Sequence, residues 1–415
     1  MGNDYIQTPH LDELAKQGIL FTHSCVVTSV CMQSRATLYT GQYSSRHKTY
    51  QVFNNITMYQ PDRWNKTLYT TMKRHGYFVG FYGKWHHKYD SKVLGNYSTF
   101  SHYRFYDGDH IIKRGNVSTH ITKLNEQDAL EFLEKRPKSR PFFLTVSFFA
   151  THAIDNSKEQ YIPQNSSLDL YSNDPVPIPK TMSEKHWKDL PYFFNDENLA
   201  RTRFFQRYNT SDMYQHHMKN TLRMATEVDT ACGNILAKLK QQNILNNTLV
   251  IFTSDNGNFH GQHGLAEKWY PFEESLRVPL IVKDPRMPHN KVGTKNAEFV
   301  LNIDLASTIL SAAEIPVPSV MQGDDFAQLY LNTTMTKWRE DFIYEFRDGN
   351  PYILNNMALV QKDFKYISWL DYNYSQLFNM KEDGAEENDI SNQTNKQSLL
   401  LKMQSRMKAL EISII

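Results

Sequence analysis

A cysteine stands at the start of a predicted helix in residues 31–40, and an arginine follows it one helical turn later. Cys31 and Arg35 therefore share one face of that helix. The amino end of a helix carries partial positive charge, so the helix and Arg35 together favour an anion at this position. For Cys31 taken alone, a structural cysteine beneath a surface helix is the alternative interpretation.

Further side chains that bind anions, transfer protons or bind metal ions follow apolar segments of the chain. In chain order they are Lys84, His86, His152, Asp255, Asn256, His263 and Lys268. Taken singly, a lysine or histidine on a loop is usually a solvated side chain, and an Asp-Asn-Gly sequence is usually a turn. Their shared position after predicted strands indicates a common site, because ligands bind beyond the carboxyl ends of strands in α/β sheets.

The elements that must position these residues alternate between strand and helix. Pro9 suits the first position of a helix, and Gly41 predicts the end of the helix that follows Cys31. The remaining predicted strands are 18–27, 77–82, 141–150 and 248–253, and the remaining predicted helices are 126–134 and 213–241. The run at 141–150 is the longest apolar one and predicts a buried strand.

Strands that alternate with helices predict an α/β fold with a large mixed, mostly parallel sheet sandwiched by helices. From about residue 338 the pattern changes to short aromatic segments separated by turns, which predicts a smaller antiparallel sheet closed by a helix at 397–410. We therefore predict a large domain at 1–337 and a C-terminal subdomain at 338–415. The polar segment 156–212 predicts a long insertion or lid that decides substrate choice.

The composition argues against several classes of protein. A formal net charge of +2 and a pI of about 8.2 do not indicate nucleic-acid binding, which usually shows a strongly basic stripe. No run reaches the roughly 18 apolar residues that a membrane span needs. The cysteines Cys25, Cys31 and Cys232 do not form a disulfide framework, although a Cys25–Cys232 bridge stays open.

Asn-x-Ser/Thr sequons are denser than chance predicts. They begin at Asn55, Asn65, Asn96, Asn116, Asn165, Asn209, Asn246, Asn332, Asn373 and Asn392. Their density predicts a glycoprotein of the secretory pathway, either lysosomal or extracellular. No signal peptide is visible at the N-terminus, so we expect the leader to be missing from this sequence.

Residues 31–41, Cys-Met-Gln-Ser-Arg-Ala-Thr-Leu-Tyr-Thr-Gly, resemble the type I sulfatase signature, which is C-x-P-S-R followed by a helix ending in T-G. The likeness continues in family order through 83–86 (Gly-Lys-Trp-His), 151–152 (Thr-His, where Pro-His is usual), 254–257 (Ser-Asp-Asn-Gly), 261–264, 268, 274–279, 302–305, 366 and 375–379. A lone C-x-x-S-R is a weak signal, but this ordered set covers nearly the whole chain. The resemblance implies an alkaline-phosphatase-like fold and hydrolysis of a sulfate ester, for which the secretory features and abundant aromatic residues favour a sulfated glycan.

The resemblance also implies roles for individual residues. A formylglycine-generating enzyme would oxidise Cys31 to formylglycine, whose hydrated aldehyde attacks sulfur. Arg35 would brace this nucleophile, and Lys84 and Lys268 would hold the sulfate oxygens. His152 would contact the substrate and protonate the leaving alcohol, and His86 would take a proton from the second hydroxyl of the aldehyde hydrate.

The same resemblance implies one divalent cation. Asp255, Asn256 and the modified Cys31 would bind Ca²⁺, because hard oxygen ligands suit calcium and a Lewis acid offsets charge on the sulfuryl oxygens. His263 would contact substrate, although a buried structural histidine explains this residue equally well.

Two features depart from the family pattern. Gln33 stands where the maturation motif has proline, and we expect conversion of Cys31 to occur because Ser34 and Arg35 are retained. Family members also begin with a strand that ends in two metal-binding aspartates, whereas residues 1–4 correspond to the segment after it. We therefore expect a truncated sequence that lacks this strand, and a genuine short form that is inactive is the alternative. The missing strand would expose the edges of its neighbours.

Two other functions stay open from the sequence. A phosphodiester or phosphonate hydrolase of the same superfamily would use similar metal chemistry, and its relative rates on aryl sulfates and phosphates would distinguish it. A catalytically silent sulfatase-like protein would bind sulfated glycans and release no sulfate.

Overall fold

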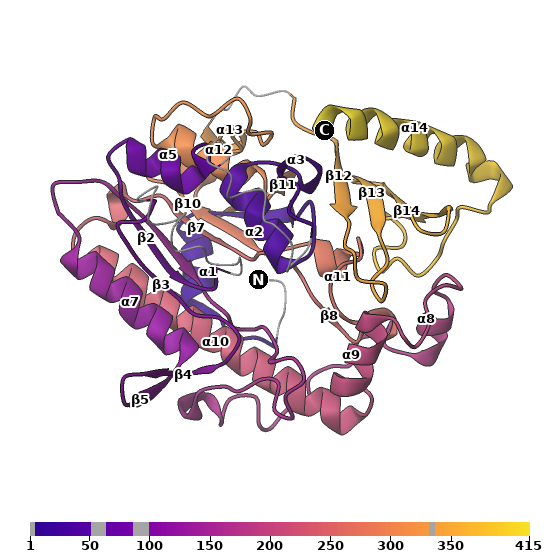
Figure 1. The fold of residues 1–415 in the computed structure, drawn as a ribbon, viewed down its shortest axis with the longest axis horizontal. Helices are drawn as coiled ribbons and strands as arrows, with labels where there is room; N and C mark the ends of the chain where they lie inside the picture. The colour runs from indigo at the N-terminus through magenta and orange to yellow at the C-terminus, as the bar shows by residue number, and fades with distance from the viewer. Residues whose placement is uncertain (1–4, 51–63, 86–98, 332–336) are drawn as a thin grey trace.

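The computed structural model describes residues 5–50, 64–85, 99–331 and 337–415. Helices cover both faces of the larger sheet region, and a second, smaller sheet lies beside it with the last helix across it (Figure 1). This arrangement confirms the predicted α/β class and the C-terminal antiparallel sheet.

The large sheet region consists of two sheets in the described residues. The first has the spatial order β11 (Thr294–Leu301), β1 (Ile19–Cys25), β10 (Leu280–Lys283) and β7 (Val250–Thr253). The second has the order β3 (His102–Phe105), β2 (Phe78–Gly83) and β6 (Phe142–Ser147), with both neighbouring pairs parallel. In the first sheet β11 is parallel to β1, whereas β10 is antiparallel to both of its neighbours.

Strands β6 and β7 each pair with one neighbour and form an edge of their sheet. All residues of both strands are only partly buried. The strand predicted to be buried at 141–150 is therefore only partly buried in β6, because an edge strand leaves one side of its backbone without a sheet partner.

Two groups of helices cover the larger sheet region on opposite faces (Figure 1). One group is α1 (Pro9–Lys16), α7 (Ile121–Lys135) and α10 (Ser211–Gln241), and the other is α2 (Cys31–Thr40), α5 (Leu68–Arg74) and α12 (Asp304–Ala312). Strand β2 shows the division, because Phe81 packs in the cluster of α2 and α5 while Tyr82 packs with Phe132 of α7. This alternation is the period-two pattern of a strand buried on both faces.

The predicted elements mostly agree with the observed ones. Helix α2 begins at Cys31 and ends where Gly41 adopts a left-handed conformation with φ +63°. Helix α7 begins at Ile121, earlier than predicted, because the imidazole of His120 accepts a hydrogen bond from the Thr122 amide and caps it.

The segment 156–212 is more regular than an unstructured insertion. It contains α8 (Glu184–Lys188) and α9 (Leu199–Arg207), and Asn198 caps α9 by accepting from the Ala200 amide at 3.0 Å. Helix α9 contacts strand β9 (Ala266–Glu267), so this segment is packed against the chain next to Lys268.

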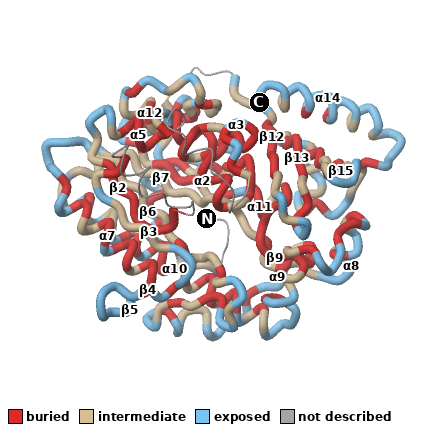
Figure 2. Tube along the Cα trace, in the orientation of Figure 1, coloured by how far each residue is buried: buried red, intermediate tan, exposed pale blue. Residues whose placement is uncertain are grey.

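The smaller sheet is an antiparallel meander. Its strands are β12 (Asp341–Phe346), β13 (Asn356–Gln361), β14 (Phe364–Trp369) and β15 (Tyr374–Asn379), and α14 (Gln397–Ile414) packs against three of them. Trp369 and Phe378 share one hydrophobic cluster with Tyr270 and Phe272 of the large region, and the buried core runs through both sheets (Figure 2). The domain boundary at 338 stays a prediction, because the apolar packing is continuous across it.

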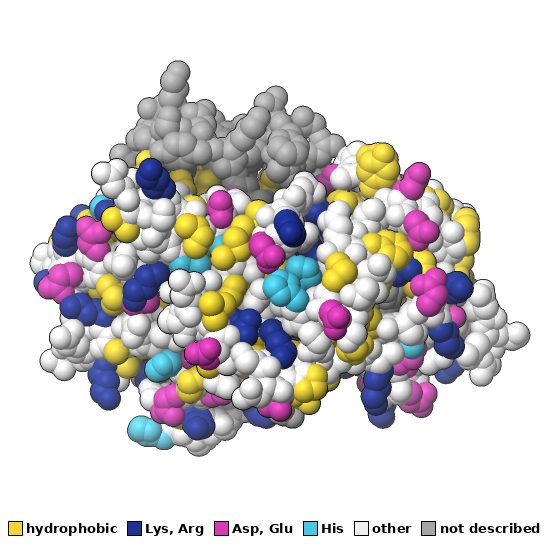
Figure 3. Space-filling view, turned by 90° about the horizontal axis from the view of Figure 1, so that it is seen from below, with side chains coloured by type: hydrophobic (Ala, Val, Ile, Leu, Met, Phe, Trp, Pro, Cys, Tyr) yellow, Lys and Arg dark blue, Asp and Glu magenta, His cyan; other side chains and the backbone are white. Residues whose placement is uncertain are grey.

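Side chains of both charge signs are interspersed over the face shown in Figure 3. Among the residues coloured there, no extended area carries a single sign, which agrees with the small net charge of +2. In the described residues no helix has the length and apolar character required to span a membrane.

Candidate functional site

The site is built around the loop that joins β1 to α2. Asn302 fixes this loop from the carboxyl end of β11, because its Oδ1 accepts from the Val27 amide at 3.0 Å and its Nδ2 donates to Ser34 Oγ at 2.9 Å. Val30 is extended, with φ −144° and ψ 133°, and helix α2 begins directly after it with Cys31, which is 3% exposed. Cys31 thus stands at the amino end of a helix whose start is held by the Asn302 side chain, directly after β11.

Gln33 is fully buried and hydrogen-bonded. Its Nε2 donates to the carbonyls of Tyr50 at 3.1 Å and Arg347 at 2.9 Å, and its Oε1 accepts from Thr28 Oγ1 at 3.2 Å. The side chain that replaces the family's proline therefore links α2 to the residue that follows β12. Whether Cys31 is converted stays a prediction.

Arg35 joins the carboxyl ends of three strands. It donates to the Lys84 carbonyl after β2 at 2.7 Å, to Ser147 Oγ at the end of β6, and to Asp255 Oδ2 after β7 at 2.9 Å. Burial alone would raise the pKa of the Asp255 carboxyl, but the positive charges of Arg35 and Lys84 outweigh burial and hold that pKa below its usual range. Asp255 is therefore an anion in the substrate-free protein.

Lys84 is 2% exposed, and its ammonium lies 5.2 Å from the ring centroid of Phe149. The preceding residue must be glycine, because Gly83 has φ +103° and a Cβ there would lie 2.0 Å from the Ser147 carbonyl oxygen. The Lys84 amide donates to that same carbonyl at 2.7 Å. The close approach of β2 and β6 thus fixes the backbone that carries Lys84.

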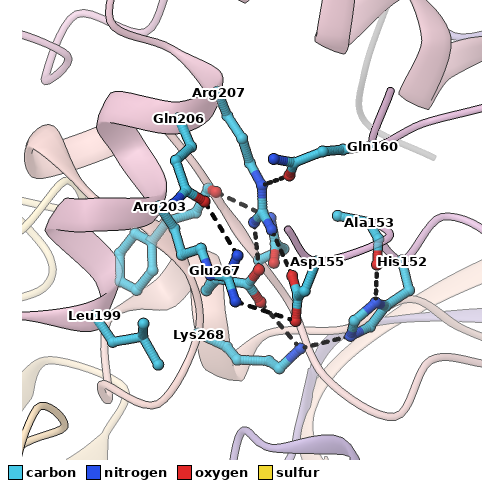
Figure 4. Close-up of polar contacts among 12 residues, drawn as sticks. His152, Ala153, Asp155, Gln160, Leu199, Arg203, Gln206, Arg207, Glu267 and Lys268 are labelled. Carbon is cyan, nitrogen blue, oxygen red and sulfur yellow. Dashed lines mark hydrogen bonds and ion pairs between the residues drawn. The ribbon is translucent and has the colours of Figure 1, made fainter. Parts of the chain in front are cut away.

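His152 and Lys268 meet at the site. Nε2 of His152 lies 3.4 Å from the Lys268 ammonium, and its Nδ1 lies 2.6 Å from the Ala153 carbonyl (Figure 4). An ammonium only donates and a carbonyl only accepts, so His152 is the neutral tautomer with its proton on Nδ1. Burial, reinforced by the charges of Lys84 and Lys268, lowers the pKa of His152 well below its ordinary value.

Lys268 is itself buried and charged. Burial would lower the pKa of its ammonium, but the negative charges of Glu267 and Asp255 act against burial, and the pKa lies above its ordinary value. Arg35, Lys84 and Lys268 therefore form a cluster of three cations near Cys31 and Asp255. Such a cluster is suited to an anionic group.

Asp255 and Asn256 follow β7 on a tight backbone. The Gly257 amide donates to the Ser275 carbonyl at 2.8 Å, and Asn256 Nδ2 donates to the Gly257 carbonyl at 2.8 Å. Asn256 Oδ1 is buried and has no hydrogen-bond partner among the described residues. A buried amide oxygen without a donor beside a carboxylate fits a hard cation.

These two oxygens are only part of a calcium coordination sphere, which takes 6–8 ligands. Within the described parts of the chain, no group of three or more His, Cys, Asp or Glu is arranged to hold a metal ion.

The other two predicted histidines are placed differently. His263 is 2% exposed, and its ring packs 4.9 Å from that of Phe272, whose own ring contacts Phe378 of β15. No contact joins it to the cation cluster among the described residues. His86 lies outside the described residues.

The structure adds Ser147, Arg207 and Glu267 to the residues named from the sequence. Glu267 stands next to Lys268, and this adjacency is the one signal that the sequence held for it. Ser147 and Arg207 reach the site through strand pairing and helix packing, so no local pattern marks them.

The family model for sulfatases matches residues 1–315, and the model of the C-terminal part of N-sulphoglucosamine sulphohydrolases matches residues 261–413. The chain belongs to the sulfatase family. It is a sulfuric ester hydrolase by this membership.

Some curated relatives of this sulfatase are named for amino sugars, whereas others are named an arylsulfatase and an ulvan-active sulfatase. The N-acetylglucosamine-6-O-sulfatase of Bacteroides thetaiotaomicron is 26% identical over 458 residues, which cover 94% of this chain and 79% of the relative. The human N-sulphoglucosamine sulphohydrolase is 28% identical over 320 residues, covering 76% of this chain and 58% of the relative.

Solved structures share the fold of this sulfatase. One, a complex with its substrate D-glucosamine-2-N,6-O-disulfate, has a TM-score of 0.83 at 22% identity and covers 100% of this chain and 94% of its own. The phosphonate monoester hydrolase of Agrobacterium radiobacter has a TM-score of 0.80 at 19% identity, with 100% and 92% covered. At these identities the likeness shows the fold alone.

Proposed function

We propose that this sulfatase removes sulfate from a sulfated glucosamine unit of a glycan, with a formylglycine made from Cys31 as nucleophile. One observation carries the proposal: Arg35, Lys84 and Lys268 converge near the helix start that bears Cys31, and all three are buried or nearly so. Asp255 and Glu267 compensate only part of this positive charge, and a sulfate monoester would supply a further anion.

The chain's own residues would bind and orient the sulfate group. Lys84 and Lys268 would donate to its oxygens, where negative charge grows as the ester bond breaks. Arg35 is held by Asp255 and by the Lys84 carbonyl, so it would brace the nucleophile from a fixed position. After conversion of Cys31, the hydrated aldehyde supplies the attacking oxygen.

His152 is the proposed proton donor to the leaving alcohol. Its Nε2 faces Lys268, and the charges of Lys84 and Lys268 disfavour a second proton on the ring in the substrate-free protein. A bound sulfate ester would offset those charges and raise the pKa of His152, so the substrate itself would prepare the acid. His86 is proposed to take the proton from the second hydroxyl of the hydrate.

A divalent cation, Ca²⁺, is proposed beside this group, with the modified Cys31 as a further ligand. Asp255 and Asn256 would supply two of its oxygen ligands, which the partnerless Oδ1 of Asn256 supports. When bound, the cation acts as a Lewis acid on the sulfuryl oxygens.

Glucosamine is proposed because the named relatives include an N-acetylglucosamine-6-O-sulfatase and an N-sulphoglucosamine sulphohydrolase. The secretory pathway, with an extracellular or lysosomal destination, is proposed as the location. Six of the seven described sequon asparagines support it, since they are exposed and only Asn65 is partly buried; the six are Asn116, Asn165, Asn209, Asn246, Asn373 and Asn392. Residues 1–337 are proposed as the catalytic domain, and His263 as a contact to more distant parts of the substrate.

The test is sulfate release by secreted protein from three esters: glucosamine 6-sulfate, N-sulfoglucosamine and 4-nitrophenyl sulfate. Peptide mass spectrometry of the same sample reports conversion of Cys31. We expect release from at least one amino-sugar sulfate, loss of release in Cys31→Ala, and unchanged release in the control Cys232→Ala. Faster turnover of phenyl phosphonate than of every sulfate, or an unmodified Cys31 in all samples, would refute the proposal.

A further inference from the structure

A buried ion pair that has no part in the proposed reaction lies next to Lys268. Arg207, at the end of α9, contacts Glu267 Oε1 through NH1, and the side chains of Arg207 and Glu267 are 1% and 6% exposed. The other oxygen of Glu267, Oε2, lies 3.3 Å from the Lys268 ammonium. One carboxylate is therefore shared between a buried arginine and a lysine of the site (Figure 4).

Arg207 is held on all sides. Its Nε donates to Gln160 Oε1 at 2.6 Å, and its NH2 donates to Asp155 Oδ1 at 2.8 Å. With NH1 on Glu267, every nitrogen of the guanidinium has a partner, so Arg207 has one position in the folded protein. Gln160 and Asp155 come from the segment that follows His152, so Arg207 also joins α9 to the His152 loop.

Glu267 is fixed through its backbone as well. It has φ +76°, a left-handed conformation that is unfavourable for a residue with a side chain. It pairs with Phe259 across the short ladder of β8 (Phe259–His260) and β9. The paired backbone therefore fixes the position from which Oε2 of Glu267 contacts Lys268. The Lys268 ammonium in turn lies 3.4 Å from His152 Nε2.

We propose that Arg207 and Glu267 are positioning residues for sulfate hydrolysis: they act through Lys268 and hold its ammonium against His152, so that ammonium and imidazole meet the sulfate ester as one unit. This inference rests on the proposed function. An ion pair that only stabilised the fold would involve Arg207 and Glu267 alone. Here the second carboxylate oxygen, Oε2, contacts the Lys268 ammonium. The glutamate also separates two buried cations that would otherwise repel each other.

The leaving group provides the decisive readout. Correct placement of Lys268 and His152 matters most when the leaving alcohol needs a proton, and little when it is 4-nitrophenol. We expect Glu267→Gln to lower kcat for the amino-sugar sulfate about tenfold more than kcat for 4-nitrophenyl sulfate, since a positioned acid contributes factors of this size or larger. Loss of folded enzyme would lower both rates equally.

Arg207→Met tests the other half of the pair. Without Arg207, the Glu267 carboxylate has Lys268 as its only cationic partner among the contacts described above, so the net positive charge around the sulfate position is smaller. We therefore expect inorganic sulfate to bind about threefold more weakly by calorimetry. Arg207→Lys keeps the charge, so it should bind inorganic sulfate as tightly as the wild type. Its kcat for the amino-sugar sulfate should still fall more than its kcat for 4-nitrophenyl sulfate. The matched control is Arg203→Lys, one turn earlier on α9, which contacts Asp155 at 3.5 Å and should behave as wild type.

Melting curves of each variant report folding separately. Equal losses on both esters, or wild-type kinetics in folded Glu267→Gln, would overturn the inference. If the wild type releases no sulfate from any ester, the proposed function fails, and the inference is decided by inorganic sulfate alone: Arg207→Met binding as tightly as Arg203→Lys would overturn it.

Discussion

Arg35 contacts Asp255 with two of its nitrogens, at 2.9 and 2.8 Å, and both contacts reach the same oxygen, Oδ2. Neither of these contacts reaches the other carboxylate oxygen of Asp255, Oδ1. Next along the chain, Asn256 has a buried Oδ1 without a hydrogen-bond partner in the described residues. The arginine thus fixes the charge and orientation of a carboxylate whose second oxygen stays available to a cation.

Calcium should stabilise the wild-type protein through Asn256. We expect added Ca²⁺ to raise Tm, by the equivalent of about 2.7 kcal/mol when its concentration is 100 times Kd, because a ligand that binds only the folded state stabilises it. Asn256→Ala should lose most of this increase, and the control Asn258→Ala should keep it. A wild-type Tm that Ca²⁺ leaves unchanged would contradict the metal assignment.

Gln33→Pro should separate maturation from stability. The substitution restores the family's motif, so we expect a larger fraction of Cys31 to be converted, as measured by peptide mass spectrometry. The partly buried carbonyls of Tyr50 and Arg347 would lose their donor, so the free energy of unfolding should fall by about 1–2 kcal/mol. Equal conversion in both proteins would show that the maturation enzyme accepts Gln33.

Gly83→Ala should destabilise the protein and displace Lys84. The added Cβ meets a carbonyl oxygen at 2.0 Å, and the φ of +103° is strained for alanine, so we expect a loss of about 3 kcal/mol or more in urea unfolding. Gly76→Ala is the control: its φ is +90°, but a Cβ there meets nothing within 4 Å, so strain alone should cost about 1 kcal/mol. Similar losses in the two variants would show that the β2–β6 approach is not tight.

Buried histidines should make the protein less stable in acid. Burial lowers the pKa of His110, His217 and His260 to about 4, whereas the unfolded value is about 6.5. The unfolded chain therefore binds more protons between these values, and stability should fall as pH drops from 6.5 to 4. His110→Phe, packed against Phe149, should reduce this slope in melting curves at pH 4.5 to 7. An unchanged slope would exclude His110 as a contributor.

A buried carboxylate should have the opposite effect in mild alkali. Burial raises the pKa of Glu386 to about 8, although Lys365 at 2.8 Å partly offsets it. The folded protein then holds a proton that the unfolded chain releases near pH 4.5, so this stabilisation is complete below 4.5 and is lost as pH rises to 8. Because the histidines act in the opposite direction up to pH 6.5, the net decline should begin above that pH.

Glu386→Gln tests this assignment, because the amide keeps an acceptor for the Glu273 amide but cannot ionise. Melting curves between pH 6.5 and 8.5 should lose most of their decline in the variant. A decline equal to that of wild type would place its origin elsewhere.

The amino-acid sequence determined the helix that carries Cys31 and Arg35, because its start and its glycine end are local features of residues 30–41. The strand ends that carry Lys84 and Asp255 were also predictable, since apolar runs and the residues that follow them are local patterns. The ordered motifs then indicated the family, which the family model confirmed.

Only the tertiary structure decided which charges meet. Arg207 reaches Lys268 through Glu267, and Ser147 at the end of β6 accepts from Arg35 on α2, because helix packing and strand pairing bring together residues far apart in the chain. The same packing turned His263 toward Phe272 and left β6 only partly buried, neither of which its local sequence indicates. Local patterns determine elements, whereas the partners of a buried charge depend on the free energy of the whole fold.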